Sequence, residues 1–227
     1  MRQFQEINPS PRTLMTPGPV EADPRVLRAM SAHILGQFDP EFTALMNETM
    51  EMERYVFHTK NHRTYLVDTT SRGGPETVLT GAICPGDKVL IPAGGRFGYL
   101  LAEILERCGA DITLLEKEWG TVFEPQEIED ALKKDSYKAV ACIHGETSTS
   151  MMQPLDELGE ICEKYGALLI VDAVATLGGA EVKVDDWKLS ACISGTQKCI
   201  SAPSGSALIT YNEQIGEIVR KRKRVEK

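Results

Sequence analysis

The sequence contains no apolar run of the roughly 20 residues that a membrane-spanning helix needs. Residues 1–8 also lack the apolar core and the small-residue cleavage site of a secretory signal. We therefore expect a cytoplasmic protein with no membrane partner. The net charge of −8 at pH 7 argues against general nucleic-acid binding, because that binding depends on an excess of Lys and Arg. A substrate or partner must therefore bind at a local site.

The six cysteines form no Cys-x-x-Cys pair, and the four histidines have no partner at the spacing of metal ligands. Several cysteines stand in apolar runs, as Cys142 does in the run 139–143. Cysteines of this kind are more often reduced packing residues than disulfides or zinc ligands. We predict no disulfide and no metal site.

The chain has 227 residues, of which 42% are hydrophobic and 26% are charged, as in an ordinary globular protein with a well-buried core. From about residue 63 onward, short apolar runs rich in Val and Ile alternate with amphipathic segments. This alternation predicts a three-layer α/β/α sandwich with a mostly parallel sheet. The expected strands cover residues 64–69, 88–92, 112–115, 138–143, 168–172, 191–194 and 206–210. The expected helices cover residues 76–83, 99–108, 125–133 and 155–165.

The ends of the chain differ from this central pattern. The first 60 residues contain Pro-rich turns and then a long helical stretch from Pro40 to about residue 57. Residues 214–227 have the pattern of a helix with a basic run at 220–224, which is most simply a solvated helix face. The loop between the last two expected strands is too short for a crossover helix, which favours an antiparallel pair at this end of the sheet.

Lys198, in the segment SGTQKC at 194–199, and Asp172, at the end of the apolar run 168–172, form a possible cofactor pair. Pyridoxal phosphate (PLP) needs a lysine amine that forms a Schiff base with its aldehyde. It also needs an Asp that keeps the pyridine nitrogen protonated, so that the ring accepts electrons. Either residue alone is more often structural, because buried strands often end in Asp and a Lys beside Gly is usually a solvated loop residue.

Three further segments accompany this pair: TPGP at 16–19, GETST at 145–149 and DAVATLGG at 172–179. Together with GTQK at 195–198, they resemble the class V aminotransferases of PLP fold type I. The resemblance covers essentially the whole chain from Leu14 onward and is strongest to the glyoxylate-using branch, which includes ureidoglycine-, alanine- and serine-glyoxylate aminotransferases. It implies the large domain of that fold, PLP as the cofactor, and Lys198 and Asp172 as catalytic residues.

The resemblance also implies a domain organisation. Residues 1–60 would form an N-terminal arm and an interface helix that pack on a partner subunit, which implies a homodimer. Residues 61–227 would form the PLP-binding large domain. Members of the family continue well beyond residue 227, into a smaller C-terminal domain that supplies an arginine for the substrate carboxylate. We therefore expect a C-terminally truncated chain with an incomplete large domain and no small domain.

Residues 68–76 (DTTSRGGPE) follow an expected strand and open an expected helix, whose free N–H groups suit a phosphate. A Gly-rich turn of this kind is common in any α/β protein. The resemblance places the phosphate-binding loop here, so we assign Thr70, Ser71 and Arg72 to the PLP phosphate. Gly74-Pro75 departs from the small and apolar residues that are usual in the family, although Pro is tolerated in a first helical turn.

The resemblance assigns four more residues to the cofactor. Phe97 would stack on the pyridine ring, and Val174 would pack on the opposite face. Thr147 would lie near the ring oxygen, although Ser150 stands where the family usually has Gly. Gln197 would reach the phosphate. Without the resemblance, Phe97 is more often a core anchor and Thr147 a helix cap. Lys198 would also be the base that moves the substrate proton.

Gly18 and Gln37 lie in segments that approach the active site in the family, so we assign them to the substrate, although an exposed Gln at a helix start is the more common explanation for Gln37. The implied reaction moves an amino group from a small amino acid to glyoxylate, a 2-oxo acid, and gives glycine. The donor would be ureidoglycine, alanine or serine, and the stretches 94–101 and 118–123 favour ureidoglycine and purine catabolism. The alternatives are a PLP-dependent lyase of the cysteine desulfurase type and a PLP-binding fragment without turnover.

Overall fold

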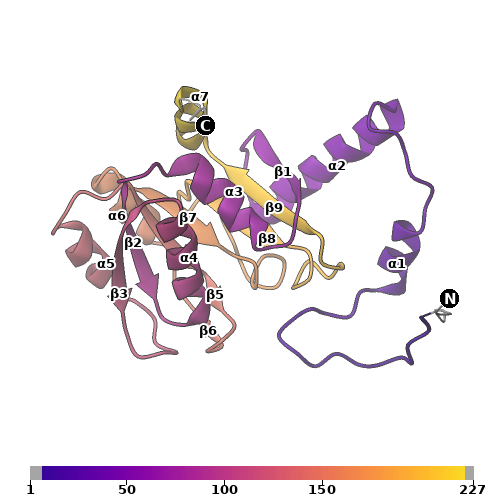
Figure 1. Cartoon of the computed structure of the whole chain (residues 1–227), viewed down its shortest axis with the longest axis horizontal. Coiled ribbons are helices and arrows are strands. Elements are labelled where there is room, and N and C mark those ends of the chain that lie inside the picture. Colours follow the sequence, from indigo (N-terminus) through magenta and orange to yellow (C-terminus); the bar gives the residue numbers. More distant parts are fainter. Residues whose placement is uncertain (1–6, 223–227) are drawn as a thin grey trace, which may run out of the picture.

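A seven-stranded sheet forms the centre of the computed structural model, which describes residues 7–222 (Figure 1). The strand order is β1-β9-β8-β7-β4-β2-β3. The seven strands are β1 (Arg63–Asp68), β2 (Lys88–Ala93), β3 (Asp111–Glu116), β4 (Ala139–Ile143), β7 (Leu168–Asp172), β8 (Ala191–Gly195) and β9 (Ser206–Tyr211). β9 is antiparallel to β1 and β8, and the other neighbouring strands are parallel. The predicted mostly parallel sheet is confirmed.

Helices cover both faces of this sheet (Figure 1). The helices of the sheet region are α3 (Gly73–Ala82), α4 (Arg96–Arg107), α5 (Pro125–Leu132), α6 (Leu158–Lys164) and α7 (Glu213–Lys221). Apolar side chains of α3, α4 and α7 share one core cluster, whereas those of α5 and α6 share the other. Within β2, Val89 and Ile91 enter the first cluster and Leu90 enters the second, as strand alternation requires. The predicted three-layer α/β/α sandwich is confirmed.

The sequence-based boundaries differ from the structure at a few elements. α6 begins at Leu158, three residues later than expected, because residues 156–157 form a turn that is closed by the Leu158 N–H to Leu155 carbonyl bond at 3.1 Å. α3 begins earlier than expected and includes Gly73, Gly74 and Pro75. A small hairpin of β5 (Gly145–Glu146) and β6 (Met151–Met152) was not predicted.

The expected C-terminal helix is α7, which Asn212 caps by accepting a hydrogen bond from the Ile215 N–H at 3.1 Å. In its basic run, Arg220 pairs with Glu213 and Glu217 on the helix surface. This pairing fits a solvated helix face. The part of the predicted helix at 223–227 lies outside the described residues.

Much of the N-terminal segment extends away from the sheet, although the end of its second helix packs against β1 and β9 (Figure 1). It contains α1 (Pro24–Met30) and α2 (Pro40–Phe57), and it was expected to include only the second helix. α1 buries no residue, and α2 buries only Glu53 and Phe57. Large apolar side chains are therefore exposed along this segment: Ile7, Leu14, Met15, Leu27, Met30, Ile34, Phe38, Leu45, Met52 and Tyr55. Across residues 7–222, no helix is both long and apolar enough to cross a bilayer.

Candidate active site

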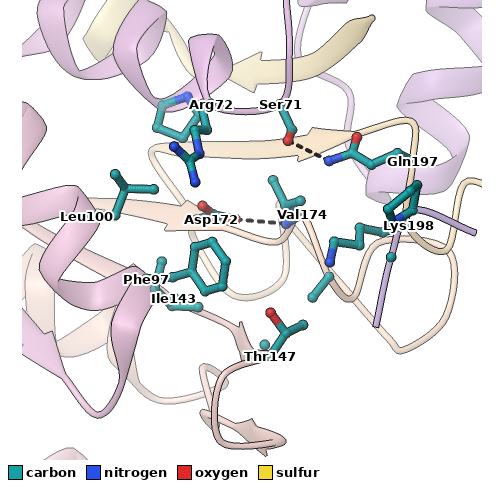
Figure 2. A pocket seen from close by; sticks show the side chains of 15 residues that line it. Ser71, Arg72, Phe97, Leu100, Ile143, Thr147, Asp172, Val174, Gln197 and Lys198 are labelled. Atoms are coloured by element: carbon teal, nitrogen blue, oxygen red, sulfur yellow. Dashed lines mark hydrogen bonds between the residues drawn. The ribbon is translucent and has the colours of Figure 1, made fainter. Parts of the chain in front are cut away.

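A cavity of about 220 Å³ opens where three parallel strands end (Figure 2). Ile143 ends β4, Asp172 ends β7, and Lys198 follows β8. Parallel sheets usually bind ligands outside the carboxyl ends of their strands. The cavity is lined by Gly18, Pro19, Ser71, Arg72, Pro75, Phe97, Leu100, Ile143, Gly145, Thr147, Asp172, Val174, Ala175, Gln197 and Lys198.

Asp172 is the buried acid of this cavity. Its Oδ1 accepts a hydrogen bond from the Val174 N–H at 2.8 Å. Burial raises the pKa of Asp172 to about 6, because desolvation disfavours the charged carboxylate, while the Val174 N–H and the Lys198 ammonium lower it. A cationic N–H group in the cavity would therefore form a charge-assisted hydrogen bond with this carboxylate.

Lys198 lies in the turn after β8 and is covered by the N-terminal arm. Its Nζ donates a hydrogen bond to the carbonyl of Pro17, and the Val20 N–H donates to the Gln197 carbonyl at 3.1 Å. Gly18 has a φ of +108°, and a Cβ at this position would lie 2.4 Å from Lys198 Cδ. Only glycine combines this backbone conformation with such a close approach to the lysine.

The start of α3 provides the polar wall of the cavity. Ser71 and Arg72 line it just before the helix begins. The Gln197 amide donates to Ser71 Oγ at 2.6 Å, and its Oε1 is buried without a hydrogen-bond partner among residues 7–222. The unpaired Gln197 Oε1 is an acceptor, whereas the Gln197 NH₂ group carries a second N–H beside the start of α3, where the positive end of the helix dipole favours an anion.

Phe97, Val174 and Thr147 point into the same space as Lys198 (Figure 2). Phe97 belongs to the first turn of α4, Val174 follows β7, and Thr147 lies in the turn between β5 and β6. Each comes from a different segment, so the cavity exists only in the folded chain. It offers apolar surfaces for a flat ring together with one amine and one buried carboxylate.

Residues 25–224 match the family described as aminotransferase class-V. The chain belongs to this family. (S)-Ureidoglycine–glyoxylate transaminase of Bacillus subtilis (strain 168) is 60% identical over 216 residues, which are 95% of this chain and 52% of that protein. Alanine–glyoxylate aminotransferase of Rattus norvegicus is 38% identical over 212 residues, which are 93% of this chain and 51% of that protein.

The crystal structure of ureidoglycine-glyoxylate aminotransferase from Bacillus subtilis superposes with a TM-score of 0.96 at 58% identity, over 97% of this chain and 57% of that chain. The predicted family and the PLP-dependent aminotransferase fold are therefore confirmed. The chain spans about half the length of the curated relatives it matches.

In this member of the class-V family, most of the predicted site residues line one cavity, but Thr70 and Gln37 do not. Thr70 is exposed beside the turn that opens α3, where its carbonyl accepts from the Gly73 N–H at 2.9 Å. Gln37 is exposed in the turn before α2. Their roles, like those of the residues that line the cavity, stay predictions.

The sequence did not predict two buried polar residues that stand beside cavity residues in the chain, namely His144 and Glu146. His144 is buried and shares a hydrogen bond of 2.8 Å with Thr176 Oγ1, and burial lowers its pKa to about 4. Glu146 is buried and binds the start of α4. Glu146 belongs to the motif GETST at 145–149, from which only Thr147 was assigned to the site, so the sequence did point to this segment. Within the described range, no group of three or more His, Cys, Asp or Glu residues is placed to hold a metal ion.

Proposed function

We propose that this chain is the PLP-binding part of an aminotransferase that moves an amino group from a small amino acid to glyoxylate and produces glycine. The observation that carries this proposal is the cavity shared by the Lys198 amine and the buried Asp172 carboxylate. PLP is the group whose binding needs both, because it has an aldehyde for an amine and a basic ring nitrogen for an acid.

The residues present fit this cofactor. Ser71, Arg72 and Gln197 would hold the phosphate at the start of α3, and Asp172 would bind the ring nitrogen. Phe97 and Val174 would contact the ring. The contact of Thr147 with the ring oxygen and the contact of Thr70 with the phosphate stay predictions. When bound, PLP supplies an electron-accepting ring that stabilises negative charge at the substrate Cα.

The side chains of the cavity would transfer the substrate proton, stabilise charge and exclude water. Lys198 Nζ would accept the proton from the substrate Cα and pass it on to C4′ of the cofactor, as transamination requires, and the Pro17 carbonyl would orient this amine between the two steps. The Asp172 carboxylate would stabilise a positive charge on the N–H group that it binds. Pro75, Leu100 and Ile143 would exclude water from the cavity wall.

Glyoxylate as the acceptor is supported by the names of both relatives, and ureidoglycine as the donor by the higher identity of the Bacillus subtilis transaminase. This donor would give the protein a place in purine catabolism, and alanine and serine are the competing donors. Gly18 and Gln37 would contact the substrate. Because both relatives are transaminases, they favour transamination over the cysteine desulfurase alternative.

The proposed assembly is a homodimer. In this proposal, residues 61–227 belong to the PLP-binding large domain, and residues 1–60 form the arm and interface helix whose exposed apolar side chains pack on a second copy. The proposed location is the cytoplasm, and one of the relatives is bacterial.

The decisive experiment is a visible absorption spectrum of the purified chain with added PLP, followed by borohydride reduction and peptide mapping. The proposal expects a new absorption band and a reduced label on Lys198. Lys183, which pairs with Glu181 on the surface, serves as the matched control lysine. A label that is scattered over surface lysines would contradict the proposal and would leave only a fragment without a working cofactor site. Where Lys198 is labelled, ureidoglycine, alanine and serine are each assayed with glyoxylate for glycine production.

A further inference from the structure

A single buried carboxylate, that of Glu146, binds the first turn of α4. Its Oε2 accepts hydrogen bonds from the Phe97 N–H at 2.8 Å and the Gly98 N–H at 3.3 Å. Its Oε1 accepts from the Ser148 N–H at 3.0 Å and from the Ser148 hydroxyl at 2.5 Å. Both carboxylate oxygens are therefore used, and each joins a different segment of the chain.

The start of α4 depends on this arrangement because it has no cap of its own. Gly95 is the N-cap residue and has no side chain to accept a hydrogen bond. The Arg96 N–H instead donates to Ser148 Oγ at 3.0 Å. The first three N–H groups of α4 are thus satisfied by Glu146 and Ser148, and the negative carboxylate lies at the positive end of the helix dipole.

Gly95 is the residue that permits this contact. A Cβ at position 95 would lie 2.4 Å from Glu146 Cγ and 2.8 Å from Ser148 Oγ. The backbone of Gly95 is extended, with a φ of 178°, so any residue tolerates its conformation. The requirement for glycine is therefore the space that the Glu146 side chain occupies.

The two segments that Glu146 joins carry two of the residues that face the cavity. Phe97 donates its own N–H to the carboxylate, and Thr147 lies between Glu146 and Ser148 in the chain. We propose that Glu146 is a positioning residue that fixes Phe97 and Thr147 relative to each other and so sets the width of the cavity between them. This inference rests on the proposed function in one respect, namely that the cavity binds PLP.

Two variants test the proposal by different routes. E146Q keeps the size of the side chain but replaces one acceptor oxygen with an NH₂ group that faces N–H donors. G95A keeps the carboxylate but forces it away from the start of α4. E127Q is the matched control, because Glu127 also binds a helix start, at α5, and lies away from the cavity.

The first measurement is amide hydrogen exchange without PLP, at residues 96–98 and 147–149. We expect exchange in both segments to rise about tenfold or more in E146Q and G95A, since each loses charge-assisted hydrogen bonds, and to stay unchanged in E127Q. Faster exchange in only one segment, or in neither, would overturn the proposal. If one variant fails to fold, the other gives the same comparison.

The second measurement is the dissociation constant for PLP, obtained from the absorption titration. We expect E146Q and G95A to bind PLP about tenfold or more weakly and E127Q to bind like the wild type. Wild-type affinity in E146Q and G95A would overturn the positioning role. A wild-type chain that leaves Lys198 unlabelled would contradict the proposed function instead, and the exchange measurement would still decide whether Glu146 joins the two segments.

Discussion

Asp172 and Glu53 are buried acids whose pKa values lie above those of exposed carboxyl groups, and burial is the main cause in both. They differ in what surrounds them. Asp172 lines the cavity and accepts a hydrogen bond from Val174. Glu53 lies on α2, and both of its carboxylate oxygens are buried without a hydrogen-bond partner among the described residues. We therefore expect the burial of each charged carboxylate to lower the stability of the folded chain. Only Asp172 lines the cavity, where its carboxylate would bind the cofactor.

The D172N variant tests two roles of the Asp172 carboxylate, its effect on stability and its effect on cofactor binding, in separate measurements. The folded-state pKa of about 6 lies above the unfolded value of 3.8, so the folded wild type holds the proton longer and its stability falls as pH rises through this window. Asn does not titrate. The stability of D172N relative to wild type, both without PLP, should therefore rise between about pH 4 and 6 and level off above that window. Thermal unfolding across this pH range measures the difference.

The same variant should bind PLP about tenfold or more weakly at pH 7.5, because a neutral amide forms a weaker hydrogen bond with a cationic nitrogen than a carboxylate does. An absorption titration measures this affinity. Equal affinity for both proteins would remove Asp172 from the cofactor site.

The E53Q variant should show a similar pH effect in a different window. The folded-state pKa of about 7 exceeds the unfolded value of 4.5, because burial disfavours the charged carboxylate. The stability of the wild type should fall as pH rises from about 4.5 to 7, and E53Q should lose this dependence. Urea unfolding at pH 4.5 and pH 8 gives the comparison. E48Q, which changes an exposed acid of the same helix, is the control. An identical pH dependence of E53Q and wild type would contradict the prediction.

α3 carries the residues next to the proposed phosphate site and depends on how closely it approaches the sheet. A Cβ at Gly74 would lie 2.6 Å from Ile193 Cγ2 of β8, whereas a Cβ at Gly81 of the same helix would meet, among residues 7–222, only Val219 Cγ2 at 3.6 Å. The first distance requires the helix to move, and the second is an ordinary contact. Close packing on the sheet therefore requires glycine at position 74, whereas the space around position 81 would admit a larger residue.

G74A and G81A should change stability in opposite directions. We expect G74A to destabilise the protein by about 1–3 kcal/mol, because it overpacks the contact between α3 and the sheet. We expect G81A to stabilise it by about 0.5–1 kcal/mol, because Ala loses less backbone entropy than Gly in a helix. Urea unfolding of both variants beside the wild type measures the signs. A stabilised G74A would show that α3 can move away from β8 freely.

The elements that the sequence predicted well are those with a long local pattern. The central strands β4, β7 and β8 are apolar runs, and their complete burial agrees with that pattern. The hairpin β5–β6 was missed because strands of two residues have no alternation to detect, and α1 was missed because seven residues hold barely two helical turns. A local pattern of that length does not distinguish a helix from a turn.

The site was predictable only in part for a related reason. The motif TSR at 70–72 offers three polar residues in a row, and only the fold shows that Ser71 and Arg72 face the cavity while Thr70 does not. The contact of Glu146 with the Phe97 N–H joins residues that are far apart in the chain. A sequence pattern records which residues are close in the chain, but it does not record which backbone groups need a partner after folding.

At the scale of the whole molecule, burial is distributed unevenly. The two core clusters lie against the sheet, and α1 and most of α2 contribute nothing to them. The exposed apolar side chains of residues 7–57 outnumber those of the rest of the described chain. A concentration of exposed apolar surface in one segment is typical of an interaction site. In the proposed homodimer, a second copy of the chain would cover this surface.

Phe38 tests this proposal because it is 88% exposed and its replacement leaves the core intact. In F38D, we expect an unchanged thermal stability of the monomer but a dimer dissociation constant that is higher by about tenfold or more, because a charge would be desolvated at the interface. Met152, which is 55% exposed on β6, gives the matched control M152D. Sedimentation velocity over a concentration series distinguishes the variants. A wild type that stays monomeric at every concentration, or equal dissociation constants for F38D and M152D, would show that residues 1–60 do not form the dimer interface.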